Sequence, residues 1–194
     1  MPGEFEPQDG VILIWPKRPG SWPYEAKEAG KVFAEIANKL AETEKVYMLT
    51  EPETEAVARE LLCENVEILT IPTDDAWARD VGPTFVTDGK EVRGVNWSFN
   101  AWGGTYDGLY QDWQKDDKVA EEFCKLTGYD YYDAAPFVLE GGSIHSDGQG
   151  TVIATEACLL SKGRNPELTK EQIEAFAAEG KFLHYDSIKR AFEF

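Results

Sequence analysis

The sequence predicts a mixed α/β fold. Short apolar runs typical of buried strands occur between segments whose apolar residues have helical spacing, and further pairs of short strands flank Gly-containing turns. The chain of 194 residues is long enough for one domain with a hydrophobic core, or for two very small ones. A loose recurrence of strand, helix and hairpin indicates a repeated α/β unit, although no sequence period is evident.

Strands and helices follow one another over the first 71 residues. The first strand is an apolar run that ends before Pro16. Gly30 weakens the helical pattern that follows without breaking it. The predicted elements of this region are a strand at 11–15, a helix at 24–43, a strand at 45–50, a helix at 53–62 and a strand at 65–71.

The rest of the chain combines hairpins with helices, so the order as a whole shows no strict alternation of strand and helix. Asp88-Gly89 and Asp147-Gly148-Gln149-Gly150 are turns typical of hairpins. Thr169 is a candidate N-cap for the last helix. The predicted elements are a hairpin with strands at 84–87 and 91–97, a helix at 116–126, a strand at 137–139, a hairpin with strands at 143–146 and 151–155, and a helix at 170–178.

The charge of the chain narrows its possible partners. With 36 acidic and 19 basic residues, the net charge is −17, which argues against nucleic acid and anionic membranes as partners. The charge would favour the approach of a small polycation, or it confers solubility alone. No apolar span has the length of a membrane helix and no signal peptide is evident, so we expect a soluble, cytoplasmic protein.

The three cysteines indicate neither a disulfide framework nor a zinc site. Cys63, Cys124 and Cys158 are widely spaced, without a CxxC pair or a nearby histidine cluster. Each lies beside Leu, Phe or Ala, which does not favour an activated thiolate. We therefore assign none of them a chemical role.

The most informative stretch is the segment DDAWARD at 74–80. It places three carboxylates (Asp74, Asp75 and Asp80), the indole of Trp77 and a guanidinium directly after a predicted strand. Carboxylates crowded at a strand end raise one another's pKa and favour a bound cation, and an indole adds cation–π contact. The cluster therefore predicts a cation-binding site. The alternative is a solvated acidic turn with the indole in the core beneath it.

A second candidate is the segment Glu140-Gly141-Gly142 after the strand at 137–139. Paired glycines let the backbone approach a ligand closely. The carboxylate of Glu140 is expected to bind a basic group or to orient a histidine. His145 could serve in acid–base chemistry, but a partly buried hairpin histidine is the simpler interpretation.

A third candidate is the aromatic and glycine-rich segment at 96–104. Its Trp and Phe side chains, Trp102 among them, could wall a pocket that its glycines cap. An ordinary aromatic core is an equally good interpretation.

Other chemistries find less support. No phosphate-binding GxxxxGK[ST] and no GxSxG elbow is present. Asp80 and Glu140 could in principle serve a small glycosidase, with tryptophans as sugar platforms. A metal site could be drawn from Asp74, Asp75, Asp80 and His145, but their spacing is not diagnostic.

Five stretches together resemble one known family. They are Met1 to Pro7, DDAWARDVGPTF at 74–85, FNAWGG at 99–104, LEGGSIH at 139–145 and EACLLSKGRNP at 156–166. In this order they are similar to the agmatine deiminases, members of the guanidine-modifying (pentein) superfamily close to the bacterial peptidyl-arginine deiminases. We therefore predict the N-terminal portion of an agmatine deiminase domain at 1–180 and a divergent tail at 181–194.

The resemblance implies a fold and an activity. The fold is a fan of ββαβ-type units around a pseudo-fivefold axis, of which this chain would form an incomplete part, a partial pentein-type α/β propeller. The activity is hydrolysis of agmatine to N-carbamoylputrescine and ammonia in putrescine biosynthesis, with no metal or organic cofactor. In that mechanism a cysteine thiolate attacks the guanidinium carbon, a histidine acts as acid and base, and carboxylates bind the guanidinium nitrogens.

The resemblance also implies roles for single residues. Asp80 matches the guanidinium-binding aspartate, and Glu140 matches the glutamate that orients the catalytic histidine. Trp77 would line the cleft against the methylene chain of the substrate. Asp74 and Trp102 complete the predicted substrate-binding set.

Two segments that the resemblance leads us to expect do not occur in the sequence. They are Asn-Gly-His-x-Asp-Asn, which carries the catalytic histidine, and Gly-Gly-Gly-Asn-Ile-His-Cys, which carries the nucleophile. We therefore expect a truncated chain that is inactive alone, and that self-associates or is complemented by a C-terminal half. A non-catalytic module that binds a guanidinium or polyamine is the alternative.

Overall fold

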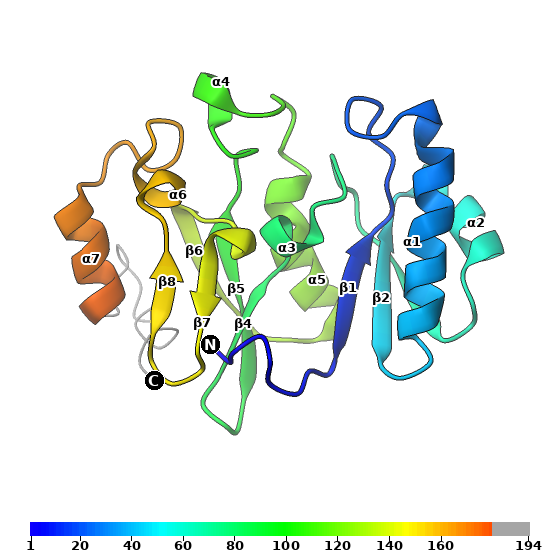
Figure 1. The fold of residues 1–194 in the computed structure, drawn as a ribbon, viewed down its shortest axis with the longest axis horizontal. Coiled ribbons are helices and arrows are strands. Elements are labelled where there is room, and N and C mark those ends of the chain that lie inside the picture. The colour runs from blue at the N-terminus through cyan, green and yellow to red at the C-terminus, as the bar shows by residue number, and fades with distance from the viewer. Residues whose placement is uncertain (180–194) are drawn as a thin grey trace. The chain divides into compact units, whose positions relative to one another are not determined.

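The computed structural model describes residues 1–179, which form two compact units (Figure 1). The smaller unit is Pro7–Ala78. The larger unit combines Met1–Glu6 with the chain from Arg79 onward. Each unit has its own sheets and core, and each is described by itself. The predicted tail at 181–194 lies outside the described residues.

The smaller unit is a parallel three-stranded sheet with two connecting helices. Its strands lie in the order β1-β2-β3, with Ile14 opposite Leu49 and Leu49 opposite Leu69. Helices α1 and α2 contact each other, and both contact β2. Strict alternation of strand and helix, which the chain as a whole does not show, therefore holds within this unit. Its elements are β1 (Gly10–Ile14), α1 (Lys27–Leu40), β2 (Lys45–Thr50), α2 (Pro52–Leu61) and β3 (Val66–Thr70).

The helix predicted at 24–43 begins later and ends earlier than expected. Tyr24, Glu25 and Ala26 have φ angles of 55°, 56° and 58°, so the backbone is left-handed there and α1 begins at Lys27. Within α1, a Cβ atom on Gly30 would lie 2.8 Å from the Trp15 ring. The glycine that weakens the helical pattern is thus the position against which Trp15 packs.

The larger unit contains a mixed three-stranded sheet in the order β4-β5-β6. The predicted hairpin is confirmed: β4 (Thr84–Thr87) pairs antiparallel with β5 (Val92–Ser98). Helix α5 (Val119–Thr127) then leads to β6 (Tyr131–Val138), which runs parallel to β5. The strand predicted at 137–139 is therefore longer and begins at Tyr131, which lies opposite Gly94.

The remaining elements of the larger unit are short. The second predicted hairpin is confirmed by the antiparallel pair β7 (Ile144–Ser146) and β8 (Val152–Ala154). Thr169 caps the last helix, accepting the Gln172 N–H, while the Gln172 side chain accepts the Thr169 N–H. Helices that the sequence analysis did not predict are α3 (Ala78–Val81), α4 (Gly104–Asp107) and α6 (Glu156–Leu160), and the last predicted helix is α7 (Lys170–Glu179).

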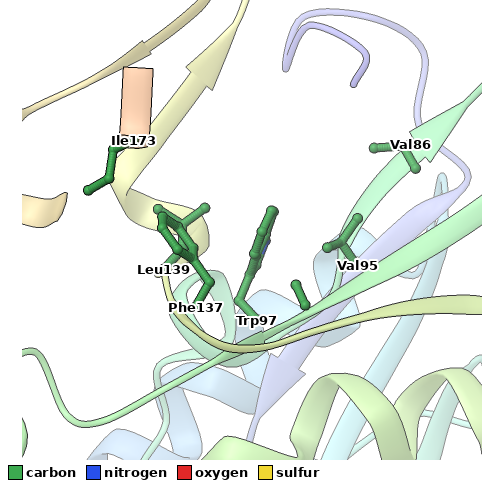
Figure 2. Packing of buried hydrophobic residues seen from close by; sticks show 7 residues of the cluster. Val86, Val95, Trp97, Phe137, Leu139 and Ile173 are labelled. Atoms are coloured by element: carbon green, nitrogen blue, oxygen red, sulfur yellow. The ribbon is translucent and has the colours of Figure 1, made fainter. Parts of the chain in front are cut away.

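The core of the larger unit forms around Trp97 and Phe137 (Figure 2). Their rings meet edge to face with centroids 6.1 Å apart, and the Trp97 indole N–H donates to the Thr84 hydroxyl at 3.0 Å. Leu139 also packs here, so the strand that leads to Glu140 is fixed by apolar contacts on one side. No helix in the described residues is long and apolar enough to cross a membrane.

We predict that Met48→Ala destabilises the smaller unit by about 2–5 kcal/mol, because Met48 is fully buried on the central strand and its loss leaves a cavity. Urea unfolding followed by circular dichroism measures the change. Val32→Ala is the matched control, because the Val32 side chain on α1 is exposed, and it should change the free energy of unfolding by less than about 0.5 kcal/mol. Equal effects of the two substitutions would contradict this core.

Candidate functional site

The residues predicted to act at the site fall into both units. Asp80, Trp102 and Glu140 belong to the larger unit, and Asp74 and Trp77 belong to the smaller one. The structure therefore gives two partial sites, each with its own geometry.

Asp80 is the centre of the partial site in the larger unit. It lies in the short helix α3, and its half-buried carboxylate accepts the backbone N–H of Gly142 and the indole N–H of Trp102. A Cβ atom on Gly142 would lie 2.5 Å from Asp80 Oδ1, and one on Gly141 would lie 2.3 Å from the Arg79 carbonyl oxygen. The paired glycines are therefore required by the close approach of the Asp80 segment.

The pKa of Asp80 is raised above its usual value. Burial is the main cause, and the charge of Glu140 is the second. The hydrogen bonds from Gly142 and Trp102 and the charge of Arg79 act in the opposite direction but are weaker. Asp80 and Glu140 thus form a pair of carboxylates that repel each other, and a cation bound to Asp80 would relieve the repulsion.

Trp102 is held by a network of its own. Ala101 and Trp102 have φ angles of 53° and 64°, so two successive non-glycine residues adopt a left-handed backbone, which is strained. The Trp102 ring meets Phe99 edge to face with centroids 5.1 Å apart, and meets Tyr110 likewise at 6.1 Å. Strain held in this way is typical of positions where a side chain must be aimed, here at Asp80.

The aromatic segment at 96–104 contains both a core residue and a half-buried residue that contacts Asp80. Trp97 is an ordinary core residue of the larger unit, whereas Trp102 is half-buried and bonds to Asp80. The Phe99 N–H donates to Asp117 at 2.6 Å, which fixes the start of the turn.

Glu140 is completely buried, and its partners lie within the larger unit. Its Oε1 lies 2.7 Å from Nε of Arg164, whose side chain is 9% exposed. The N–H bond is not aligned with the oxygen, so the contact is an ion pair rather than a directed hydrogen bond. The Ser143 hydroxyl donates to Oε2 at 2.6 Å.

The loop that carries Arg164 is fastened on both sides. Asn165 accepts the Val138 N–H at 2.9 Å and donates to the Val138 carbonyl at 3.0 Å, so its amide pairs with the end of β6 as a strand would. Asn165 also donates to the Leu159 carbonyl at 3.1 Å. Asn100 donates to the Gly163 carbonyl at 2.7 Å. These bonds place Arg164 beside Glu140.

Arg164 and Asn165 contact the segment around Glu140, and the sequence analysis did not single them out. They were noted only as part of a stretch that resembles a family. Their partners lie 24 and 27 positions earlier in the chain, so no local spacing relates them. The only available signal was Glu140 itself, because a buried glutamate requires a basic partner somewhere in the chain.

His145 is the remaining candidate for acid–base chemistry, and it has little support as a site residue. His145 is exposed on β7 opposite Ile153, so it lies in the predicted hairpin but is not partly buried as expected. Cys158 accepts a hydrogen bond from the Thr155 hydroxyl at the start of α6. Arg79, within the acidic cluster, is exposed and pairs with Glu4.

The partial site in the smaller unit lies at the carboxyl ends of its parallel strands. Trp77 and Asp74 are half-buried, and the Asp74 carbonyl accepts a long hydrogen bond of 3.5 Å from Arg18. The Trp77 indole N–H donates to Asp75 at 2.9 Å. Ligands of open α/β sheets bind at this edge. Lys17 and Glu51 form an ion pair at the same edge.

The structure does not favour the alternative chemistries. Within residues 1–179, no three or more His, Cys, Asp and Glu side chains gather as a metal site requires. A glycosidase needs two carboxyl groups that face the sugar. Glu140 is instead fully buried, with Arg164 and Ser143 on its two oxygens.

Known proteins share this sequence and fold. The family model described as Porphyromonas-type peptidyl-arginine deiminase matches residues 1–180. A protein of Selenomonas ruminantium named "Putative agmatine deiminase" is 54% identical over 180 residues, which are 90% of this chain and 48% of that protein. The chain spans about half the length of the curated relatives it matches.

Solved structures give the same result. The agmatine deiminase of Enterococcus faecalis has a TM-score of 0.86 at 46% identity, over 90% of this chain and 48% of that one. The C. jejuni C315S agmatine deiminase with substrate bound has a TM-score of 0.74 at 26% identity, over 90% and 50% of the two chains.

The fold is therefore that of guanidine-modifying deiminases, and the predicted α/β fold of partial pentein type is confirmed. More narrowly, the chain belongs to the Porphyromonas-type peptidyl-arginine deiminase family.

We predict that Glu140→Gln lowers the pKa of Asp80, because it removes one of the charges that raise it. A titration of the Asp80 carboxyl carbon by NMR measures the shift. Asp88→Asn, in an exposed hairpin turn, is the control and should leave the Asp80 titration unchanged. The folded state binds the Asp80 proton more tightly than the unfolded state does. The contribution of Asp80 to the free energy of unfolding should therefore fall as the pH rises above the usual pKa of an aspartate. A Glu140→Gln variant with an unchanged Asp80 titration would contradict the coupling.

We also predict that Arg164→Met destabilises the chain by about 3–5 kcal/mol, because it leaves the buried Glu140 charge without its cation. Adding Glu140→Gln should restore part of the loss, which urea unfolding of the single and double variants measures. Arg59→Ala is the control, because it breaks an exposed pair with Glu55 and should cost less than about 1 kcal/mol. A loss that the second substitution leaves unchanged would contradict a charge-based cause.

Proposed function

We propose that these residues supply the guanidinium-binding part of an agmatine deiminase, the hydrolase that converts agmatine to N-carbamoylputrescine and ammonia in putrescine biosynthesis. The observation that carries the proposal is the carboxylate pair Asp80 and Glu140, which repel each other at the end of β6. Family membership and the agmatine deiminases among the structural relatives support it.

Asp80 is the residue proposed to bind the guanidinium. Its carboxylate is held by the Gly142 and Trp102 N–H groups, so its orientation is set before the substrate arrives. A guanidinium is planar and donates in a fork that matches a carboxylate. The product has a neutral, urea-like group at that end, so a charged pocket would hold the substrate more strongly than the product.

Glu140 is proposed to act through its charge and through the group that it orients. In this chain Arg164 occupies one side of its carboxylate. The second oxygen accepts the Ser143 hydroxyl, which can also turn to another acceptor. Glu140 is therefore placed to orient a basic catalytic group without being exposed to water.

Trp77 is proposed to contact the methylene chain of the substrate, and Asp74 is proposed as a further substrate-binding residue. An indole face provides apolar contact for a methylene chain, and it also attracts a cation. The net charge of −17 would favour the approach of a dication such as agmatine. The cytoplasmic location, self-association and complementation by a C-terminal half stay predictions.

The histidine and the cysteine nucleophile are not assigned to any residue of this chain. Without them, residues 1–194 are proposed to bind agmatine weakly and to release no ammonia. The alternative, a non-catalytic guanidinium-binding module, differs in requiring strong binding by this chain alone.

The experiment combines calorimetry with an ammonia assay on residues 1–194. We expect the chain to bind agmatine with a Kd of about 1 mM or weaker and to release no ammonia from it. The Asp80→Asn variant should show no binding. Putrescine, which has an amine in place of the guanidinium, should bind more weakly than agmatine. Binding at about 1 μM would favour the non-catalytic module, and turnover abolished by Cys158→Ser would overturn the assignment of roles.

A further inference from the structure

Asp75 accepts four hydrogen bonds in the smaller unit, two from the loop after β1 and two from its own loop. Its Oδ1 accepts the Trp22 indole N–H at 2.9 Å and the Ala76 N–H at 2.8 Å. Its Oδ2 accepts the Trp77 indole N–H at 2.9 Å and the Ser21 hydroxyl. The side chain is 0% exposed. Each carboxylate oxygen therefore holds one indole.

The two indoles come from different parts of the same sheet edge. Trp22 lies in the loop after β1 and Trp77 in the loop after β3, and both loops leave the carboxyl ends of parallel strands. Hydrogen bonds to a carboxylate are about twice as strong as neutral ones. Trp77 is therefore fixed at its N–H edge while its ring remains half-buried, with part of its surface open to contact.

Trp22 has a second support that makes the two indoles distinguishable. Its ring packs edge to face on Phe33 of α1, with centroids 5.5 Å apart and an angle of 83°. If the carboxylate were altered, Trp22 would retain this aromatic contact.

We propose that Asp75 is a positioning residue of the substrate site: by binding the Trp77 indole N–H, it orients the ring for contact with the alkyl chain of a guanidinium substrate. Asp75 itself is too deeply buried to touch that substrate. The identity of the ligand rests on the function proposed above, whereas the orienting role rests on the contacts of Asp75 alone.

The isosteric substitution Asp75→Asn separates the two indoles. The new amide has one oxygen and one NH2 group, and the NH2 group cannot accept a hydrogen bond. In the Oδ1 position the NH2 group would face the backbone N–H of Ala76 and the indole N–H of Trp22, and neither of these donors can become an acceptor. On the Oδ2 side the Ser21 hydroxyl can turn and accept. The amide should therefore keep Trp22 and release Trp77.

The experiment follows the indole N–H signals of the 15N-tryptophan-labelled chain by NMR, with Trp22→Phe and Trp77→Phe assigning the two signals. In Asp75→Asn we expect solvent exchange of the Trp77 N–H to become about tenfold faster, as the loss of a hydrogen bond to a charged group implies. The Trp22 signal should stay close to its original exchange rate. An unchanged Trp77 signal would overturn the proposal.

Ser21→Ala is the matched control. It removes a donor from the same oxygen but leaves both indole bonds in place, so neither signal should change its exchange rate. Release of Trp77 by Ser21→Ala to the same extent would show that general loosening of the loop, not the carboxylate, is the cause, and would overturn the proposal.

Two further measurements keep the result decisive. If Asp75→Asn does not fold, the unsubstituted chain still provides a test, because a Trp77 N–H that exchanges as fast as a free indole would overturn the proposal. Agmatine added to the unsubstituted chain should shift the Trp77 signal, with a several-fold weaker effect in Asp75→Asn. A chain that shows no response to agmatine would count against the proposed function, while the exchange rates would still decide the role of Asp75.

Discussion

The larger unit depends on the contact between Glu140 and Arg164. A fully buried carboxylate is costly unless a cation or hydrogen-bond donors compensate for the loss of water. The cation comes from a loop that Asn165 fastens to the end of β6 and that Asn100 holds from the opposite side. The same glutamate raises the pKa of Asp80. One charge therefore links the end of the sheet, the loop and the carboxylate proposed to bind the substrate.

Two fully buried carboxylates of the chain, Glu140 and Asp75, are compensated in different ways. Glu140 is paired with a guanidinium, and the alignment of that contact is imperfect. Asp75 accepts aligned hydrogen bonds from two indoles, a hydroxyl and a backbone amide. A charge pair tolerates small changes in orientation, whereas directed hydrogen bonds do not. The ion pair therefore suits Glu140, which acts on Asp80 through its charge. The directed hydrogen bonds suit Asp75, which fixes the orientation of an indole ring.

Much of the fold could be predicted from the sequence because the signals are local. The hairpins follow from Asp-Gly and Gly-rich turns, and the helices of the smaller unit follow from apolar spacing. The start of β6 could not be predicted in this way, since Tyr131 to Asp133 gain their strand structure by pairing with β5. The start of α1 was missed because three non-glycine residues are left-handed there, which propensity does not predict. At the site, Asp80 was singled out by the crowding of its neighbours, whereas Arg164 is defined only by a contact distant in sequence.

The order of the chain within the two units has a consequence for how the molecule can be altered. The larger unit includes the first six residues and resumes at Arg79, and the side chains of Glu4 and Arg79 are in contact. The chain thus leaves the larger unit and returns to it at neighbouring points. The smaller unit is therefore an insertion, or cassette, within the sequence of the larger one. Such a cassette can be exchanged between relatives through two nearby junctions. Residues 7–78 are therefore a natural unit for recombination, because their exchange would leave the carboxylates Asp80 and Glu140 of the larger unit in place.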